Sequence, residues 1–137
     1  MPRRQRGVIL LEALLATLIL AIGLLGAIGL QARAYSALSD ADMRGEAAIA
    51  TERVLDTMSN DQLHLADYAL AANAAPSARL AAWHAATLAA LPGATIVITL
   101  TPTLDLSRTE VVVTISWTRK AGAALNTHRV IAYVALS

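Results

Sequence analysis

An apolar run near the N-terminus limits what this chain can fold into. The residues from Ala13 to Leu30 carry one polar side chain, the hydroxyl of Thr17. A helix of about 20 consecutive apolar residues is long enough to cross the hydrocarbon core of a bilayer. Hydrophobic residues make up 56% of the chain and charged residues only 15%, and much of this apolar excess lies in the run. The run therefore predicts a membrane-spanning helix.

The charges around the run predict its orientation. Three basic residues, Arg3, Arg4 and Arg6, precede it. Positive side chains next to a span stay on the cytoplasmic side of the membrane. We therefore expect the N-terminus in the cytoplasm and the rest of the 137-residue chain to be exported, which leaves room for one ordinary domain. No basic patch in that domain indicates nucleic-acid binding.

Three kinds of N-terminal segment fit these features. An ordinary secretory signal peptide would be cleaved after Ala34, but its apolar core would exceed the usual length of about 7–15 residues. An uncleaved membrane anchor would keep the whole run. Neither explains Glu12, because a carboxylate in hydrocarbon costs roughly 2–3 kcal/mol or more. In the third alternative the processing site lies before the run, between Gly7 and Val8.

A compound motif supports this third alternative. Glu12 is the fifth residue after Gly7, and a short basic leader precedes the glycine. The stretch GVILLEALLATLILAIGLLGAIGLQARA resembles the type IV prepilin and pseudopilin family, whose hallmark is G-F-[T/S]-L-x-E leading into a long apolar helix. The part from Leu15 to Ala34 is especially similar to the PilV group of minor pilins, the type IV pilus modification proteins. Val8 departs from the pattern, since most members have Phe or Met there.

The resemblance implies a role for each residue of the motif. In this family a membrane-embedded prepilin peptidase cleaves after the glycine and the new N-terminus is N-methylated. Here the cleavage would fall between Gly7 and Val8, and Val8 would be methylated. Glu12 would then meet the positive amine of a neighbouring subunit and set the stagger of subunits entering the filament. The competing explanation is a tolerated glutamate that snorkels to a membrane interface.

A single long helix is expected to follow. No proline occurs between Pro2 and Pro76, so we expect a continuous helix from Val8 to about Ser59, roughly 80 Å long at about 1.5 Å per residue. Its second half is amphipathic, and we expect a globular domain to pack onto its apolar stripe. The stripe with helical spacing is Leu38, Ala41, Gly45, Ala48, Ile49, Glu52, Leu55 and Met58.

The remaining sequence predicts a second helix and a sheet. Stop signals at Pro76 and Pro92 bound a helix of about four turns. Three stretches with a period of two then predict β-strands, at Ile96–Thr101, Val111–Thr118 and Val130–Leu136. We therefore expect an α+β fold, in which the long N-terminal helix packs against an antiparallel sheet of about three strands, with a second short helix between. This is also the fold of pilins.

The sequence indicates no enzyme chemistry. His64, His84 and His128 have no His, Asp or Glu at the spacing typical of a zinc site. No nucleophile elbow and no phosphate-binding glycine loop occurs. We therefore expect no catalytic, metal-binding or cofactor-binding residues, and no small-molecule ligand. Without cysteine the chain forms no disulfides, and Trp83 and Trp117 are expected in the core.

These observations predict three parts of the chain. Residues 1–7 form a basic leader peptide, residues 8–34 the transmembrane and assembly half of the long helix, and residues 35–137 the exported pilin domain. Before assembly the protein would be a single-pass protein of the inner membrane with its C-terminal domain in the periplasm. It would then enter an extracellular pilus or a periplasmic pseudopilus.

The expected function is that of a minor pilin, which joins other minor pilins in a complex that primes type IV pilus assembly at the filament tip. Its expected partners are the inner membrane, the prepilin peptidase, other minor pilins and the pilus assembly machinery. A minor pseudopilin of a type II secretion system is the closest alternative, because it shares the N-terminal motif and a similar size. An alternative of another class is an exported binding or enzymatic domain released by cleavage after Ala34.

Overall fold

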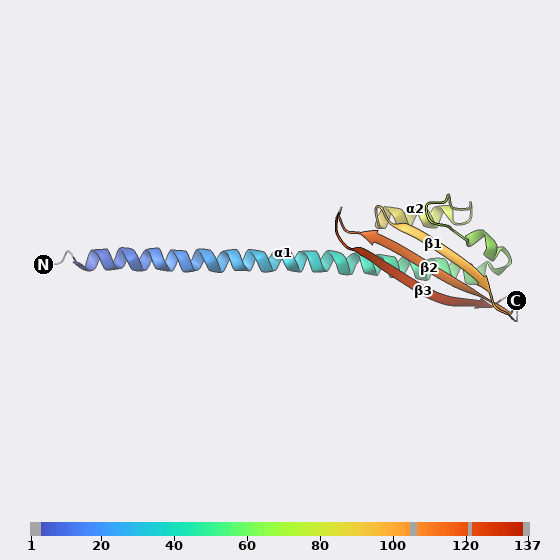
Figure 1. Ribbon diagram of the computed structural model, residues 1–137, viewed down its shortest axis with the longest axis horizontal. Helices are drawn as coiled ribbons and strands as arrows, with labels where there is room; N and C mark the ends of the chain where they lie inside the picture. The colour runs from blue at the N-terminus through green and yellow to red at the C-terminus, as the bar shows by residue number, and fades with distance from the viewer. Residues whose placement is uncertain (1–3, 105–106, 121, 136–137) are drawn as a thin grey trace. The chain divides into compact units, whose positions relative to one another are not determined.

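The computed structural model describes residues 4–104, 107–120 and 122–135. It confirms the expected α+β fold, with a long N-terminal helix, a short second helix and a three-stranded antiparallel sheet (Figure 1). The chain forms two compact units, one ending at Ser39 and the other beginning at Asp40. The elements in chain order are α1 (Arg4–Asn60), the 3-10 helix η1 (Gln62–Tyr68), α2 (Ala81–Ala90), β1 (Thr95–Pro102), β2 (Arg108–Thr118) and β3 (Leu125–Ala135).

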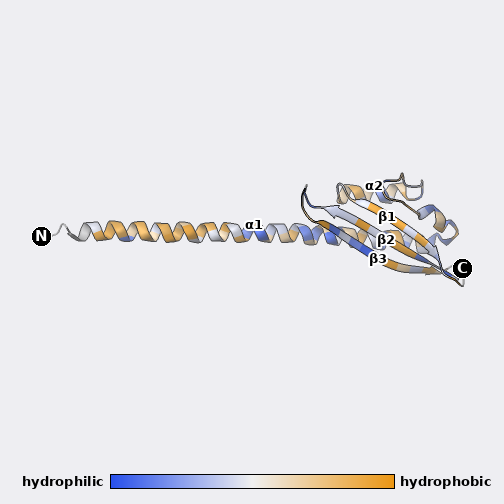
Figure 2. Ribbon diagram, viewed as in Figure 1, coloured by the Kyte–Doolittle hydropathy of each residue, from blue (hydrophilic) through white to orange (hydrophobic). Residues whose placement is uncertain are grey.

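Helix α1 extends over 57 residues and passes from the first unit into the second. Every residue from Gly7 to Tyr35 is exposed. Figure 2 shows that the N-terminal half of α1 is predominantly hydrophobic and that hydrophilic residues become frequent after it. By length and composition, this helix is apolar enough to cross a membrane.

The part of α1 in the second unit contributes one face to the domain core. Its buried residues are Ala47, Ala50, Thr51, Val54 and Met58, and their spacing of three or four residues places them on one side of the helix. The inward-facing residues of β2 complete this core, and three of them, Val111, Val113 and Ile115, have no exposed surface.

The predicted stripe is wrong at Leu38 and Ile49 but right at its C-terminal end, where Met58 is buried and Leu55 packs against the core. Leu38 is 66% exposed and Ile49 is 44% exposed, whereas the core face lies on a neighbouring stripe that begins at Ala47. The physical reason is that the buried stripe consists partly of small residues and Thr51. The Thr51 hydroxyl donates to the carbonyl of Ala47 at 2.9 Å, so its burial leaves no unsatisfied polar group.

The sheet has the order β1-β2-β3 with antiparallel pairing throughout. One row across it pairs Ile98 with Val113 and Val113 with Val130. Strand β3 begins at Leu125, earlier than the predicted start at Val130. Its first residues are mostly polar, because they lie on a strand that is only half-buried, so hydropathy alone did not reveal them.

Helix α2 packs against the core through one apolar face. Leu80, Thr87 and Leu91 are buried. The indole Nε1 of Trp83 donates to the carbonyl oxygen of Ala50 at 2.8 Å, which fastens α2 to α1. Trp117 is 3% exposed and Trp83 packs against the same core, as expected for both tryptophans.

A polar cluster joins η1 to the segment before α2. The carboxylate of Asp61 accepts hydrogen bonds from the hydroxyl of Tyr68 at 3.0 Å and from Nη1 of Arg79 at 2.8 Å. Nδ1 of His64 lies 2.7 Å from the other oxygen of Asp61. Nε of Arg79 also donates a hydrogen bond to Oδ2 of Asp67 at 3.2 Å. The cluster therefore fixes the connection between α1 and α2 through charge-assisted bonds.

Candidate functional site

The three residues of the N-terminal motif lie close together near the start of α1. Gly7, Val8 and Glu12 are all exposed. Val8 and Glu12 are four residues apart, so they share one face of the helix, about 6 Å apart along its axis. A Cβ atom added at Gly7 meets nothing within 4 Å beyond its chain neighbours and the backbone of its own helix. The fold of the described chain therefore gives no packing reason for a glycine at this position.

Glu12 is surrounded by large apolar side chains on the helix surface. Leu11 is 59% exposed and Leu15 is 52% exposed. Among the side chains that the structure describes, no cation lies within ion-pair distance of this carboxylate. A carboxylate that enters an apolar environment without a partner is costly. Within a membrane, Glu12 would therefore need either a partner from outside these side chains or access to water at the interface.

The other polar side chain of the segment is already satisfied. The hydroxyl of Thr17 lies 3.0 Å from the carbonyl oxygen of Ala13 and 2.9 Å from that of Leu14. Such a bond to the preceding turn is the usual way in which a helix accommodates a threonine in an apolar setting. From Glu12 to Leu30, this leaves Glu12 as the polar side chain that the helix itself does not satisfy.

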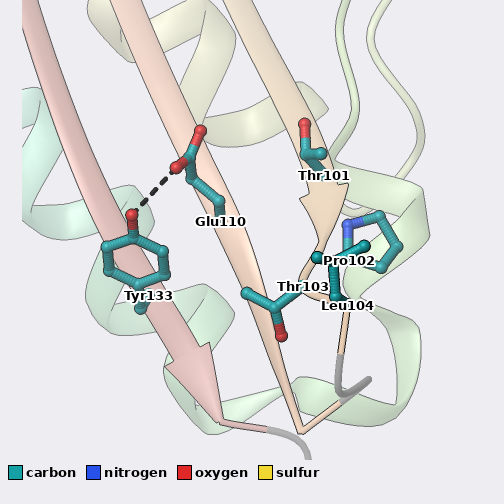
Figure 3. A pocket seen from close by; sticks show the side chains of 6 residues that line it. All are labelled: Thr101, Pro102, Thr103, Leu104, Glu110 and Tyr133. Carbon is teal, nitrogen blue, oxygen red and sulfur yellow. Dashed lines mark hydrogen bonds between the residues drawn. The ribbon is translucent and has the colours of Figure 1, made fainter.

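The second unit contains an open hollow of about 600 Å³ at the end of the β1–β2 hairpin. Figure 3 shows its lining, which combines threonines with Pro102, Leu104 and the Glu110–Tyr133 pair. The hydroxyl of Tyr133 on β3 donates to Glu110 on β2 at 2.9 Å. This hydrogen bond to the carboxylate raises the pKa of Tyr133 above its ordinary value. The two ionisable groups of the hollow are therefore already paired with each other.

The histidines do not gather with other ligands. His64 contacts Asp61, and among the described residues no group of three or more His, Asp or Glu side chains could hold a metal ion. Asp67 follows His64 by three residues in the sequence, but the structure pairs His64 with Asp61, three residues before it. This contact is part of the polar cluster that fixes η1.

Sequence reasoning did not single out Glu110 and Tyr133. The available signal was a period of two. Glu110 lies between buried Thr109 and Val111, and Tyr133 lies between half-buried Ala132 and buried Val134, so both side chains lie on the outward face of the sheet. Their direct pairing depends on the β2–β3 register, in which Glu110 lies opposite Tyr133. That register is a property of the folded sheet.

Comparison with known proteins found no relative of this chain. The chain matches no protein-family model, no curated protein and no solved structure.

Proposed function

We propose that this chain is a minor pilin, which joins other minor pilins in a complex that primes type IV pilus assembly at the filament tip. The observation that carries the proposal is the placement of Glu12. It lies five residues after Gly7, without a charge partner among the described side chains, at the start of an exposed apolar helix. The resemblance of this segment to prepilins gives that carboxylate a partner.

The partner is the amine that processing creates. Cleavage of the Gly7–Val8 bond by the prepilin peptidase frees a positive N-terminus at Val8, which is then methylated. A positive amine and a carboxylate attract strongly in an apolar medium, where the effective dielectric constant is low. The amine of one subunit pairs with Glu12 of its neighbour. Once such a pair is buried, removing one member leaves an uncompensated charge and costs about 3–5 kcal/mol.

The fold supports the proposal because α1 combines a candidate membrane span with one face of the domain core. Its apolar N-terminal half is a candidate membrane span, and its C-terminal half supplies Ala47, Val54 and Met58 to the domain core. A chain of this kind stays in the inner membrane until it is assembled, with the C-terminal domain in the periplasm. Fold alone does not define a function, so the support for this function comes from the motif around Glu12.

Complementation of a deletion strain tests the assembly role of Glu12. We expect Glu12→Ala to insert and to be cleaved normally, since removing a charge favours residence in the membrane. The defect should appear when subunits associate, as fewer surface filaments and lost co-purification with other minor pilins. Glu12→Gln should share most of this defect, because it keeps the shape but loses the charge.

Glu52→Ala is the matched control for this experiment. Glu52 is an exposed glutamate on the same helix, in the second unit, and its replacement should leave filament numbers unchanged. Immunoblots must first show that each variant is processed and abundant. Wild-type filament numbers with Glu12→Ala would contradict the assembly role and would favour a snorkelling glutamate.

A further inference from the structure

Strand β3 forms an open edge of the sheet. It is the last strand in the order β1-β2-β3 and extends over 11 residues (Figure 1). No other strand among the described residues pairs with its outer side. The opposite edge is partly covered, because Leu70 and Ile98 exchange two backbone hydrogen bonds of 3.0 and 2.9 Å. The two edges of the sheet therefore differ in how far their backbone groups are satisfied.

The bridge at Leu70 identifies the backbone groups that face outward on β3. Ile98 turns its N–H and C=O toward Leu70, and hence away from β2. Hydrogen-bonded and non-hydrogen-bonded pairs alternate along antiparallel strands and across them. Val113, opposite Ile98, therefore directs its groups to Val130 on β3. The residues on either side of Val130 consequently point their N–H and C=O groups to the open edge.

These outward-pointing groups belong to odd-numbered residues, including Thr127, Arg129, Ile131 and Tyr133. The β2–β3 register is continuous, without a bulge that would twist the edge away. β3 contains no proline, and Arg129 is its single permanently charged residue. Proteins usually protect a strand edge with charges, prolines or bulges, because an open edge is a template for another strand. β3 carries little of this protection.

The inward-facing side chains of the sheet are also less completely buried on β3 than on β2. On β2 the inward-facing residues Val113 and Ile115 have no exposed surface. Their neighbours on β3, Val130 and His128, are only half-buried. A further strand beside β3 would cover the open side of these residues and would pair the outward backbone groups at the same time.

We propose that β3 takes up an extended segment of a partner protein as a fourth strand, with a carboxylate of that segment next to Arg129. Arg129 is exposed and forms no ion pair with the described side chains. Glu110, the acid within the three strands, lies on the same face of the sheet and is hydrogen-bonded to Tyr133. β3 itself contains no Asp or Glu. A second copy pairing β3 with β3 therefore lacks the complementary charge that an acidic partner strand supplies.

The test uses the full-length protein in detergent micelles and a fluorescently labelled synthetic peptide of about ten residues, the length of a long strand. The peptide alternates valine with threonine and carries one central glutamate. Fluorescence anisotropy should show saturable binding to the wild type. Ile131→Pro should weaken binding about tenfold, since it removes an N–H that points to the open edge. The ladder to β2 uses Val130, so tryptophan fluorescence should show that this variant is folded.

A charge exchange gives an independent arm that leaves the backbone intact. Arg129→Glu should weaken binding of the glutamate peptide about fivefold and strengthen binding of a matched lysine peptide, as expected for a pair of facing charges. Arg53→Glu, an exposed arginine on α1, is the control and should change neither. If Ile131→Pro does not fold, this charge exchange decides alone.

Three results would overturn the proposal. The first is that the wild type does not bind the glutamate peptide, and the second is that Arg129→Glu binds the glutamate and lysine peptides as the wild type does. The third is that folded Ile131→Pro binds the glutamate peptide as tightly as the wild type. Self-association of the wild type that Ile131→Pro abolishes would also overturn it, because the occupant would then be a second copy. The inference depends on the sheet and not on the proposed pilin function. Failure here leaves the Glu12 experiment unaffected.

Discussion

Nη1 of Arg79 lies 2.8 Å from Oδ2 of Asp61, which ties the segment before α2 to the first residue after α1. Asp61 also receives hydrogen bonds from Tyr68 and His64. The hydrogen bond from His64 lowers the pKa of Asp61 below its ordinary value, with further contributions from the Tyr68 hydroxyl and the Arg79 charge and a partial opposition from burial. Ionised Asp61 therefore stabilises the connection between the two helices.

This lowered pKa predicts how stability depends on pH. The stabilisation by Asp61 is fully present above the pKa of an unfolded aspartate, about 3.9. It is lost as pH falls through the lower pKa of the folded state, because Asp61 then binds a proton. We expect thermal unfolding of the full-length protein, followed by tryptophan fluorescence, to shift to lower temperature over this acidic range.

Asp61→Asn separates this contribution from those of the other acids. The variant should unfold at a lower temperature than the wild type at neutral pH, and its unfolding temperature should depend less on pH below about 4. Identical pH profiles for wild type and variant would show that Asp61 does not contribute the predicted stability.

The buried face of α1 can be tested with two matched substitutions. Val54 is 1% exposed and Ile49 is 44% exposed. Val54→Asp buries an unpaired charge and should lower the free energy of unfolding by about 4 kcal/mol or more. Ile49→Asp should cost about 1 kcal/mol or less, since its charge remains in water. Denaturant unfolding measures both. A larger loss with Ile49→Asp would place the core on the stripe that the sequence alone suggested.

The sequence could predict the elements of this fold better than their register. The absence of proline between Pro2 and Pro76 predicts one long helix, and α1 indeed ends at Asn60. A period of two predicts the strands. The predicted stripe of α1 was right at Met58 and wrong at Leu38 and Ile49. The middle of the buried face instead consists of Ala47, Ala50 and Thr51, whose hydroxyl is bonded within the helix. Hydropathy ranks Ile49 above these residues, whereas shape and the position of the sheet decide which side is buried.

The candidate site, too, could be predicted from the sequence only in part. The spacing of Gly7, Val8 and Glu12 is visible in the sequence, and the helix then places Val8 and Glu12 on one face. The open edge of β3 was not visible, since it depends on strand order and on the bridge between Leu70 and Ile98. Both are contacts between residues far apart in the chain, which local patterns do not encode.

The role of Gly7 can be separated from folding. A Cβ added at this position meets nothing within 4 Å beyond its chain neighbours and the backbone of its own helix, so Gly7→Val should leave the described fold intact. We expect the variant to retain its leader, because the pocket of the prepilin peptidase requires a small residue at the cleavage site. Gly23→Val is the control, since Gly23 has equally open surroundings on the same helix and should be processed normally. An immunoblot that shows normal loss of the leader from Gly7→Val would contradict the cleavage assignment.

The mass of the mature N-terminal peptide tests the proposed function most directly. The protein is purified from membranes of the native host, digested and analysed by mass spectrometry. The account predicts that the chain begins at Val8 and that this residue carries a methyl group on its amine, so that Glu12 remains in the mature protein. A chain that begins at Tyr35 would show an ordinary signal peptide cleaved after Ala34, and an intact Met1 would show an uncleaved anchor. Either of these results would contradict the assignment as a pilin.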